Sequence, residues 1–211
     1  MIKVILVEDN FYVREVLKQM IAGDSRFQIL ATTDDAFEAE KLCAEHSPDL
    51  VLMDVQTAGN HSGLAAGRRI KKNFPDTKIV IVTSLVDAEV LAEAKNGCAD
   101  SLWYKDYGTK DVLDVMIRTA GGERVFPLNS PNVTLKDIFS DDLTEKQMKI
   151  LRCFVKGYTY AETAEELGMS LQNVRWHLDR IVEKGNFENK HELLMTILDS
   201  KLIVTNLLDE D

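Results

Sequence analysis

Four short apolar runs each end in polar side chains that suit phosphoryl and metal-ion chemistry. The runs and the residues that follow them are Ile2–Val7 before Glu8 and Asp9, Leu50–Met53 before Asp54, Lys78–Val82 before Thr83 and Ser84, and Ala99–Tyr104 before Lys105. Polar residues are common at strand ends, so it is the joint spacing that is informative. If the runs are neighbouring parallel strands, their carboxyl ends share one edge of the sheet, where open α/β folds bind ligands. The sequence therefore predicts one pocket with three carboxylates, a hydroxyl and a lysine.

The side chains of that pocket indicate its chemistry. Three clustered carboxylates repel one another unless a cation lies among them. Oxygen ligands without a nearby histidine or cysteine favour a hard ion, so we expect Mg²⁺. A lysine beside such an ion can neutralise a phosphoryl group. One of the carboxylates could be the nucleophile, since aspartate forms acyl phosphates.

Alternating strand and helix patterns must position these residues. A fifth strand is expected at Phe27–Ala31. Helices are expected over about Phe11–Ala22, Asp35–His46, Leu64–Asn73, Asp87–Asn96 and Lys110–Ala120. Strict alternation of strand and helix predicts a flavodoxin-like, doubly wound α/β domain, whose five parallel strands carry helices on both faces.

The second part of the chain has a different pattern. Residues 121–140 begin with two glycines and contain two prolines, which is typical of a linker. The periodicity is helical from residue 141. Expected helices follow a Thr144 cap up to Gly157, and span about Tyr160–Leu167, Leu171–Lys184 and Lys190–Lys201. A short helix, a tight turn and a longer helix form a helix-turn-helix pattern, so we expect a smaller all-α four-helix domain over 141–211.

Residues 1–120 resemble the receiver domain of a two-component response regulator. Glu8 and Asp9 match its acidic pair, Asp54 its phosphoacceptor, Thr83 its hydroxyl residue and Lys105 its lysine. The resemblance implies a sensor histidine kinase as partner.

The same resemblance implies roles for particular residues. It implies Mg²⁺ held by Asp9, Asp54, the Gln56 carbonyl and, through water, Glu8. Lys105 would pair with the phosphoryl oxygens and Thr83 would donate a hydrogen bond to them, while the small Ser84 leaves the phosphate accessible. Inward movement of Thr83 would shift the population of a two-state element.

Residues 141–211 resemble the LuxR-type output domain of the NarL/FixJ class. The matching residues are Leu143, Thr144, Gly157, Ala164–Gly168, Ser170, Val174, His177 and Lys184. The resemblance implies that the Leu171–Lys184 helix enters the major groove of double-stranded DNA. Base contacts are expected from Gln172, Arg175 and Trp176, and phosphate contacts from Asn173, Arg180, Lys184 and Lys190.

Several positions depart from the family patterns. Receivers carry Tyr or Phe three residues before the lysine, where this chain has Leu102. The loop after Asp54 has Thr57-Ala58 in place of Met-Pro and is one residue longer. Asp179 lies on the expected reading helix, and Gly185-Asn186-Phe187 replaces Leu-Gly-Val. These departures bear on phosphate switching, on metal coordination and on the end of the reading helix.

Charge and composition constrain the function further. The 211 residues carry a net charge of −10, and residues 141–211 contain 9 basic and 14 acidic residues, a net of −5. DNA-binding modules are mostly basic, so the basic residues here must cluster on one face or act through dimer avidity. Three isolated cysteines indicate reduced thiols in a cytoplasmic protein. The absence of an apolar run of about 18 residues predicts no membrane span.

Three functions remain open from the sequence. The first is a transcription factor in which phosphorylation of Asp54 modulates homodimerisation and sequence-specific DNA binding, with RNA polymerase as a further candidate partner. The second is an atypical receiver regulator that switches without phosphate. The third is a protein-interaction regulator that does not bind DNA. An enzyme acting on an external substrate is not expected, because beyond self-phosphorylation and slow autodephosphorylation at Asp54 no second nucleophile–base set is present.

Overall fold

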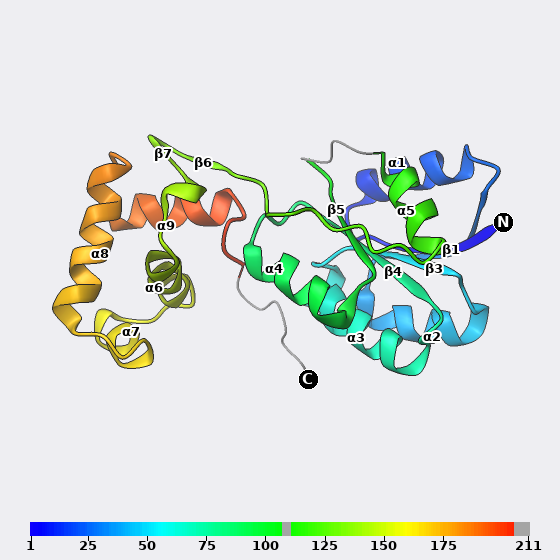
Figure 1. Ribbon diagram of the computed structural model, residues 1–211, viewed down its shortest axis with the longest axis horizontal. Helices are drawn as coiled ribbons and strands as arrows, with labels where there is room; N and C mark the ends of the chain where they lie inside the picture. Colours follow the sequence, from blue (N-terminus) through cyan, green and yellow to red (C-terminus); the bar gives the residue numbers. More distant parts are fainter. Residues whose placement is uncertain (107–110, 205–211) are drawn as a thin grey trace. The chain divides into compact units, whose positions relative to one another are not determined.

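The computed structural model describes residues 1–106 and 111–204, which form two compact units. The first spans Met1–Asn129 and the second begins at Ser130. Strands and helices alternate in the first unit, whereas the second is a short hairpin followed by helices (Figure 1).

The first unit is a five-stranded parallel sheet in the order β2-β1-β3-β4-β5. Its strands are β1 (Ile2–Val7), β2 (Phe27–Thr33), β3 (Leu50–Met53), β4 (Lys78–Thr83) and β5 (Ser101–Tyr104). Its helices are α1 (Phe11–Ala22), α2 (Ala36–His46), α3 (Gly63–Asn73), α4 (Ala88–Glu93) and α5 (Val112–Ala120). Helices α1 and α5 cover one face, and α2, α3 and α4 cover the other (Figure 1). The predicted doubly wound parallel fold is confirmed.

The strands are apolar at nearly every position because both faces of the sheet are covered. Valine and leucine side chains of β1, β3 and β4 pack against apolar residues of α1 and α5 in one buried cluster. All four residues of β3 are buried. The strand that carries the expected nucleophile is therefore held rigidly in the middle of the sheet.

Helix boundaries differ from the expectation where a cap or a glycine intervenes. Helix α4 ends at Glu93 and continues as a π-helical turn, η2 (Ala94–Cys98), in which Gly97 has φ +108°. Helix α5 starts at Val112, with the Asp111 side chain accepting from the Leu113 backbone N–H. The expected start at Lys110 lies outside the described residues.

The chain after α5 remains attached to the first unit, although residues 121–140 were expected to be a linker. The Val125 backbone N–H donates to Ser101 Oγ at 2.9 Å, and Ser101 Oγ lies 2.7 Å from Thr119 Oγ1. Thr119 Oγ1 in turn donates to the Val115 carbonyl, so Ser101 must donate to Thr119. The Leu102 backbone N–H donates to the Val125 carbonyl at 3.0 Å. The segment around Val125 thus covers the edge strand β5.

The rest of the expected linker belongs to the second unit. Strands β6 (Thr134–Leu135) and β7 (Ile138–Phe139) form a small antiparallel hairpin. Leu135 and Ile138 are buried there. The expected linker thus contains the end of one unit and the start of the next.

The second unit continues as a helical bundle. Its helices are η3 (Ser140–Asp142), α6 (Glu145–Val155), α7 (Tyr160–Glu166), α8 (Leu171–Lys184) and α9 (Lys190–Asp199). Helix α6 begins with a capping box, in which Thr144 and Gln147 satisfy each other's backbone N–H groups. The buried core includes Ile150, Leu151, Val174, Leu178, Ile181, Leu193 and Ile197. Helices α7 and α8 flank the turn at Gly168 and form the expected helix-turn-helix.

Candidate functional site

Asp54 follows β3 at the carboxyl edge of the sheet. Its Oδ1 accepts from the Val55 backbone N–H at 2.7 Å, and its Oδ2 accepts from Lys105 Nζ at 2.7 Å. Only 7% of its surface is exposed. The parallel pairing of β1 with β3 places Glu8 beside it, and the pairing of β4 with β5 delivers Lys105.

Glu8 and Asp9 complete an acidic cluster with Asp54. One carboxylate oxygen of each lies within 4.8 Å of the others. Glu8 is 1% exposed, and its Oε2 lies 2.6 Å from Lys105 Nζ. Among the described residues no donor is oriented for a hydrogen bond to that buried oxygen. Asp9 is exposed at the mouth of the cluster.

The electrostatics of the pocket are dominated by burial. Burial raises the pKa of Asp54 to about 7, with a further contribution from the charge of Glu8, while Lys105 acts in the opposite direction. Burial acts to lower the pKa of Lys105, but Asp54 and Glu8 outweigh it and the pKa is raised. One ammonium thus contacts two of the three clustered carboxylates. A cluster of three carboxylates, two of them buried, has the chemistry of a site for a hard divalent cation.

The expected hydroxyl residues lie on the neighbouring strand. Thr83 is fully buried at the end of β4, and its Oγ1 accepts from the Leu85 backbone N–H at 3.0 Å. The Lys105 backbone N–H donates to the Thr83 carbonyl at 2.9 Å, which fixes the two strand ends together. Ser84 follows and is half-buried. The hydroxyl of Thr83 is therefore engaged within its own turn.

The expected switch position on β5 carries no aromatic ring. Leu102 is buried and pairs in register with Ile81, whereas the buried Tyr104 pairs with Thr83. Trp103 packs against the core on the α1 and α5 side, as strand alternation predicts. The backbone N–H of Leu102 also donates to the Val125 carbonyl.

The loop after Asp54 is held by contacts that sequence reasoning missed. Thr57 is buried, accepts from the Ala36 backbone N–H at 3.0 Å and donates to the His61 carbonyl at 2.8 Å. His61 Nδ1 lies 2.7 Å from Asp35 Oδ1. Gln56, the expected carbonyl ligand, is exposed and forms an isolated bridge with Ser62. The Thr57-Ala58 departure thus gives a loop anchored to the start of α2.

Gly63 allows that loop to pass close to the acceptor. A Cβ atom on Gly63 would lie 1.8 Å from the Asp54 carbonyl oxygen. Its backbone N–H donates to the Val55 carbonyl at 2.8 Å. Only glycine fits here, so the return of the chain into α3 constrains the backbone at Asp54.

In the second unit, α8 presents the expected base-reading residues. Gln172, Arg175 and Trp176 are exposed, with Trp176 at 56%, while Val174 and Leu178 face the core. The helix face that the LuxR-type resemblance assigns to DNA is thus exposed.

Most of the expected phosphate contacts have partners within the unit. Arg180 pairs with Glu183 at 3.1 Å, and Lys184 pairs with Asp142 at 2.9 Å. Lys190 lies over the rings of Phe154 and Tyr160, and Arg175 also lies over Tyr160. Asn173 is half-buried, and its backbone N–H donates to Ser170 Oγ.

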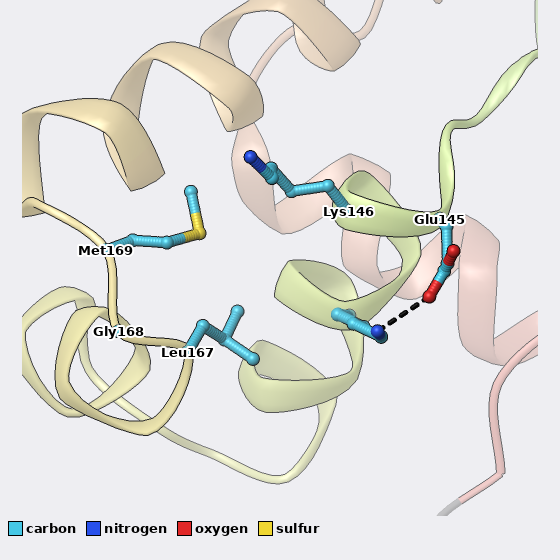
Figure 2. Close-up of a pocket in the computed structure, with 6 residues that line it drawn as sticks. Glu145, Lys146, Leu167, Gly168 and Met169 are labelled. Atoms are coloured by element: carbon cyan, nitrogen blue, oxygen red, sulfur yellow. Dashed lines mark ion pairs between the residues drawn. The ribbon is translucent and has the colours of Figure 1, made fainter.

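An open hollow of about 350 Å³ lies beside the helix-turn-helix turn. Leu167 and Met169 line one side, and α6 supplies Lys146 on the other (Figure 2). Lys149 in the same wall pairs with Glu145 at 2.6 Å. Burial, with the charge of Lys146, lowers the pKa of His177 on α8. Lys146 is a cation that the sequence analysis did not assign to this surface.

A profile of the response regulator receiver domain matches residues 4–117, more than half of the chain. The chain belongs to the response regulator family. A second profile, bacterial regulatory proteins of the luxR family, matches residues 141–197 of this response regulator. The NarL/FixJ resemblance drawn from the sequence is confirmed, and the protein is a transcription regulator rather than an enzyme acting on an external substrate.

Curated relatives match this response regulator over nearly its whole length. The oxygen regulatory protein NreC of Staphylococcus haemolyticus is 28% identical, covering 95% of this chain and 99% of the relative. The response regulator protein VraR of Staphylococcus aureus is 28% identical, covering 96% and 99%.

Solved structures share the fold. A LuxR-family two-component response regulator from Aurantimonas aligns with a TM-score of 0.56 and 26% identity, over 62% of this chain and 91% of that chain. RcsB of Salmonella enterica serovar Typhimurium, bound to promoter DNA in the presence of phosphomimetic BeF3−, aligns with a TM-score of 0.63 and 19% identity, over 94% and 98%. Within the described residues of our response regulator, no helix is both long and apolar enough to cross a membrane.

Proposed function

We propose that a sensor histidine kinase phosphorylates this response regulator on Asp54, and that phosphorylation modulates homodimerisation and sequence-specific binding to double-stranded DNA. The observation that carries the proposal is the convergence of Asp54, Glu8, Asp9 and Lys105 at one sheet edge. The expected cellular location is the cytoplasm, where RNA polymerase is a further candidate partner.

The pocket has the groups that phosphoryl transfer needs. An Asp54 oxygen would bond to phosphorus as the phosphorus–nitrogen bond of the donor phosphohistidine breaks, and the imidazole would leave with the electron pair. Lys105 already contacts Asp54 Oδ2, so its ammonium is positioned to move onto a phosphoryl oxygen. Thr83 would have to exchange its Leu85 contact for the phosphoryl group. Slow autodephosphorylation at Asp54 would reset the protein.

The acidic cluster is suited to Mg²⁺. Asp9 and Asp54 would hold the ion directly, Glu8 through water, and the Gln56 carbonyl would complete the set. Bound Mg²⁺ would neutralise charge on the transferring phosphoryl group. The residues of the chain would supply the nucleophile and its orientation.

The second unit would read DNA through α8. Gln172 and Arg175 have the donors and acceptors for base edges, and Trp176 supplies an apolar surface suited to a thymine methyl group. Because residues 141–211 carry a net negative charge, binding by both subunits of a dimer would be important for affinity. The DNA-bound RcsB neighbour supports this assignment at the level of the fold.

Labelling with a small phosphodonor tests the acceptor. Acetyl phosphate and Mg²⁺ should add one phosphoryl group to the wild-type chain, measured by intact mass. Asp54→Asn should abolish the addition, and the exposed Asp76→Asn should leave it unchanged. The assignment would be contradicted if Asp54→Asn still took up a phosphoryl group, or if the label were found on another aspartate.

A second candidate function rests on the burial of Asp54, both of whose oxygens are engaged. In that case the receiver would switch through a partner or ligand without phosphate. It would be favoured if wild-type protein takes up no phosphoryl group while its DNA binding still responds to another signal. A complete lack of salt-sensitive DNA binding would instead favour a protein-interaction regulator.

A further inference from the structure

Six basic side chains of the second unit are held in two different ways. One group pairs with carboxylates: Lys136 with Glu192, Lys149 with Glu145, Arg180 with Glu183 and Lys184 with Asp142. Arg175 and Lys190 have no carboxylate partner among the described residues. Both instead lie over the ring of Tyr160.

Tyr160 stands where the four helices α6 to α9 meet. It is the first residue of α7 and is half-buried. The ring of Phe154 from α6 packs against it edge-on, with centroids 5.0 Å apart. Arg175 from α8 places Cζ 5.4 Å from the Tyr160 centroid, and Lys190 from α9 places Nζ at 4.3 Å. The single ring of Tyr160 therefore contacts one cation from α8 and one from α9.

The two kinds of partner have opposite effects on DNA binding. A carboxylate cancels the charge of its cation and must be displaced before a phosphate can bind. An aromatic ring attracts a cation through its quadrupole but leaves the net charge and the N–H donors available. It also restricts two long side chains that are otherwise free to rotate, and such restriction before binding favours affinity. This matters in a unit whose acidic residues outnumber its basic ones.

We propose that Tyr160 is a positioning residue that holds Arg175 and Lys190 together as cations that contact DNA. The inference rests on the proposed DNA binding and adds the means by which an acidic unit achieves it. Tyr160 acts through the two cations and needs no contact with DNA of its own.

The test is a mutant cycle on the full chain with beryllofluoride and Mg²⁺ present. The probe is a fluorescein-labelled duplex of mixed sequence, and Kd is measured by anisotropy over a range of salt concentrations. Tyr160→Phe keeps the ring and should bind within about twofold of wild type. Tyr160→Leu should weaken binding about fivefold with little change in the salt slope, because both charges remain.

The cycle separates positioning from packing. In the background Arg175→Gln with Lys190→Gln, adding Tyr160→Leu should change Kd by less than about twofold, since no cation is left to position. An equal loss in both backgrounds would assign Tyr160 a packing role and overturn the inference. Wild-type affinity in Tyr160→Leu would overturn it as well.

A second measurement does not depend on a folded variant. In wild-type protein with labelled lysine, the Lys190 side-chain protons should be shifted upfield by the Tyr160 and Phe154 rings. Random-coil shifts there would overturn the inference. If wild-type protein binds no DNA at low salt, the proposed function itself fails; if it binds and the cycle is additive, only the role of Tyr160 fails.

Discussion

The two units hold their candidate functional cations in contrasting surroundings. In the first, Lys105, whose side chain is 12% exposed, lies between Asp54 and Glu8 at the carboxyl edge of the sheet. In the second, Arg180 and Lys184 form exposed ion pairs, while Arg175 and Lys190 lie over an aromatic ring. A buried ion pair is strongly coupled to stability and to protonation, whereas exposed contacts exchange readily. Under the proposed function, the first unit would respond to a local change in charge, and the cations of the second would exchange their present partners for DNA phosphates.

The largest effect is expected where the backbone itself shapes the first site. Gly63→Ala should lower the free energy of unfolding by about 3 kcal/mol or more, because the new methyl group would collide with the Asp54 carbonyl. Chemical denaturation in a Trp176→Phe background measures it, since Trp103 is then the remaining tryptophan and reports the first unit.

Gly23→Ala is the matched control for that experiment. Gly23 has a right-handed φ of −73°, and its added Cβ would come no closer than 3.2 Å to another atom. Its effect should stay below about 1 kcal/mol. Equal effects of the two alanines would show that the Gly63 contact relaxes easily.

Removing the lysine cation from each unit tests the contrast directly. Lys105→Met leaves two buried carboxylates without their ammonium and should cost about 2–3 kcal/mol at pH 7. Lys184→Met removes an exposed pair and should leave the unfolding midpoint of the second unit, followed by Trp176 in a Trp103→Phe background, unchanged. A similar loss from both substitutions would remove the distinction between the units.

The pH dependence of stability sharpens the account of the first pocket. The pKa of Asp54 is raised from 3.8 to about 7, so the folded state retains a proton that the unfolded chain releases. Stability attributable to this group therefore falls as pH rises from about 4 to 7 and stays lower above that range. Asp54→Asn should be near neutral at pH 4 and stabilising by roughly 2 kcal/mol at pH 8.

Added Mg²⁺ should narrow the difference between wild type and Asp54→Asn at pH 8, because a cation among the carboxylates favours their ionised forms. Urea unfolding of both proteins at pH 4 and pH 8, with and without Mg²⁺, measures the pH dependence of this difference and its change on adding the ion. A pH-independent difference between the two proteins would show that Asp54 titrates normally in the folded state.

The smallest effect is expected at an arginine that is already neutralised. Arg180→Gln should weaken binding of the mixed-sequence duplex by no more than about twofold, since Glu183 offsets its charge. Arg175→Gln should cost about fivefold under the same conditions. A larger loss of binding for Arg180→Gln than for Arg175→Gln would mean that the Arg180–Glu183 pair opens on DNA. It would also mean that the position of Arg175 over Tyr160 does not matter for binding.

The sequence predicted the first pocket better than the second surface for a physical reason. Strand period and parallel order fix where Asp54 and Lys105 must lie, because backbone pairing places strand ends together. Side-chain partners across the fold leave no such local signal. The bond between Thr57 and the start of α2 joins residues 21 apart, and the position of Lys190 over Tyr160 depends on how three helices pack.

Local turn rules also gave an incomplete picture of the connection between the units. Two glycines and two prolines indicated a linker over residues 121–140, yet Val125 is bound to β5 and Leu135 is buried in the next unit. The glycine rule was more useful after α4, where Gly97 lies near the end of the helical stretch, in η2. The roles of Thr83, Ser84, Gln56 and the DNA-contacting residues stay predictions.

The attachment of Val125 to β5 determines where the gene can be divided. A receiver fragment that stops at residue 120 would lack the carbonyl that accepts from Leu102 and the N–H that donates to Ser101. It would expose the bare outer strand of a sheet, a surface that recruits strands from other chains and promotes aggregation. A fragment that stops at Asn129 keeps this edge sealed by its own polypeptide.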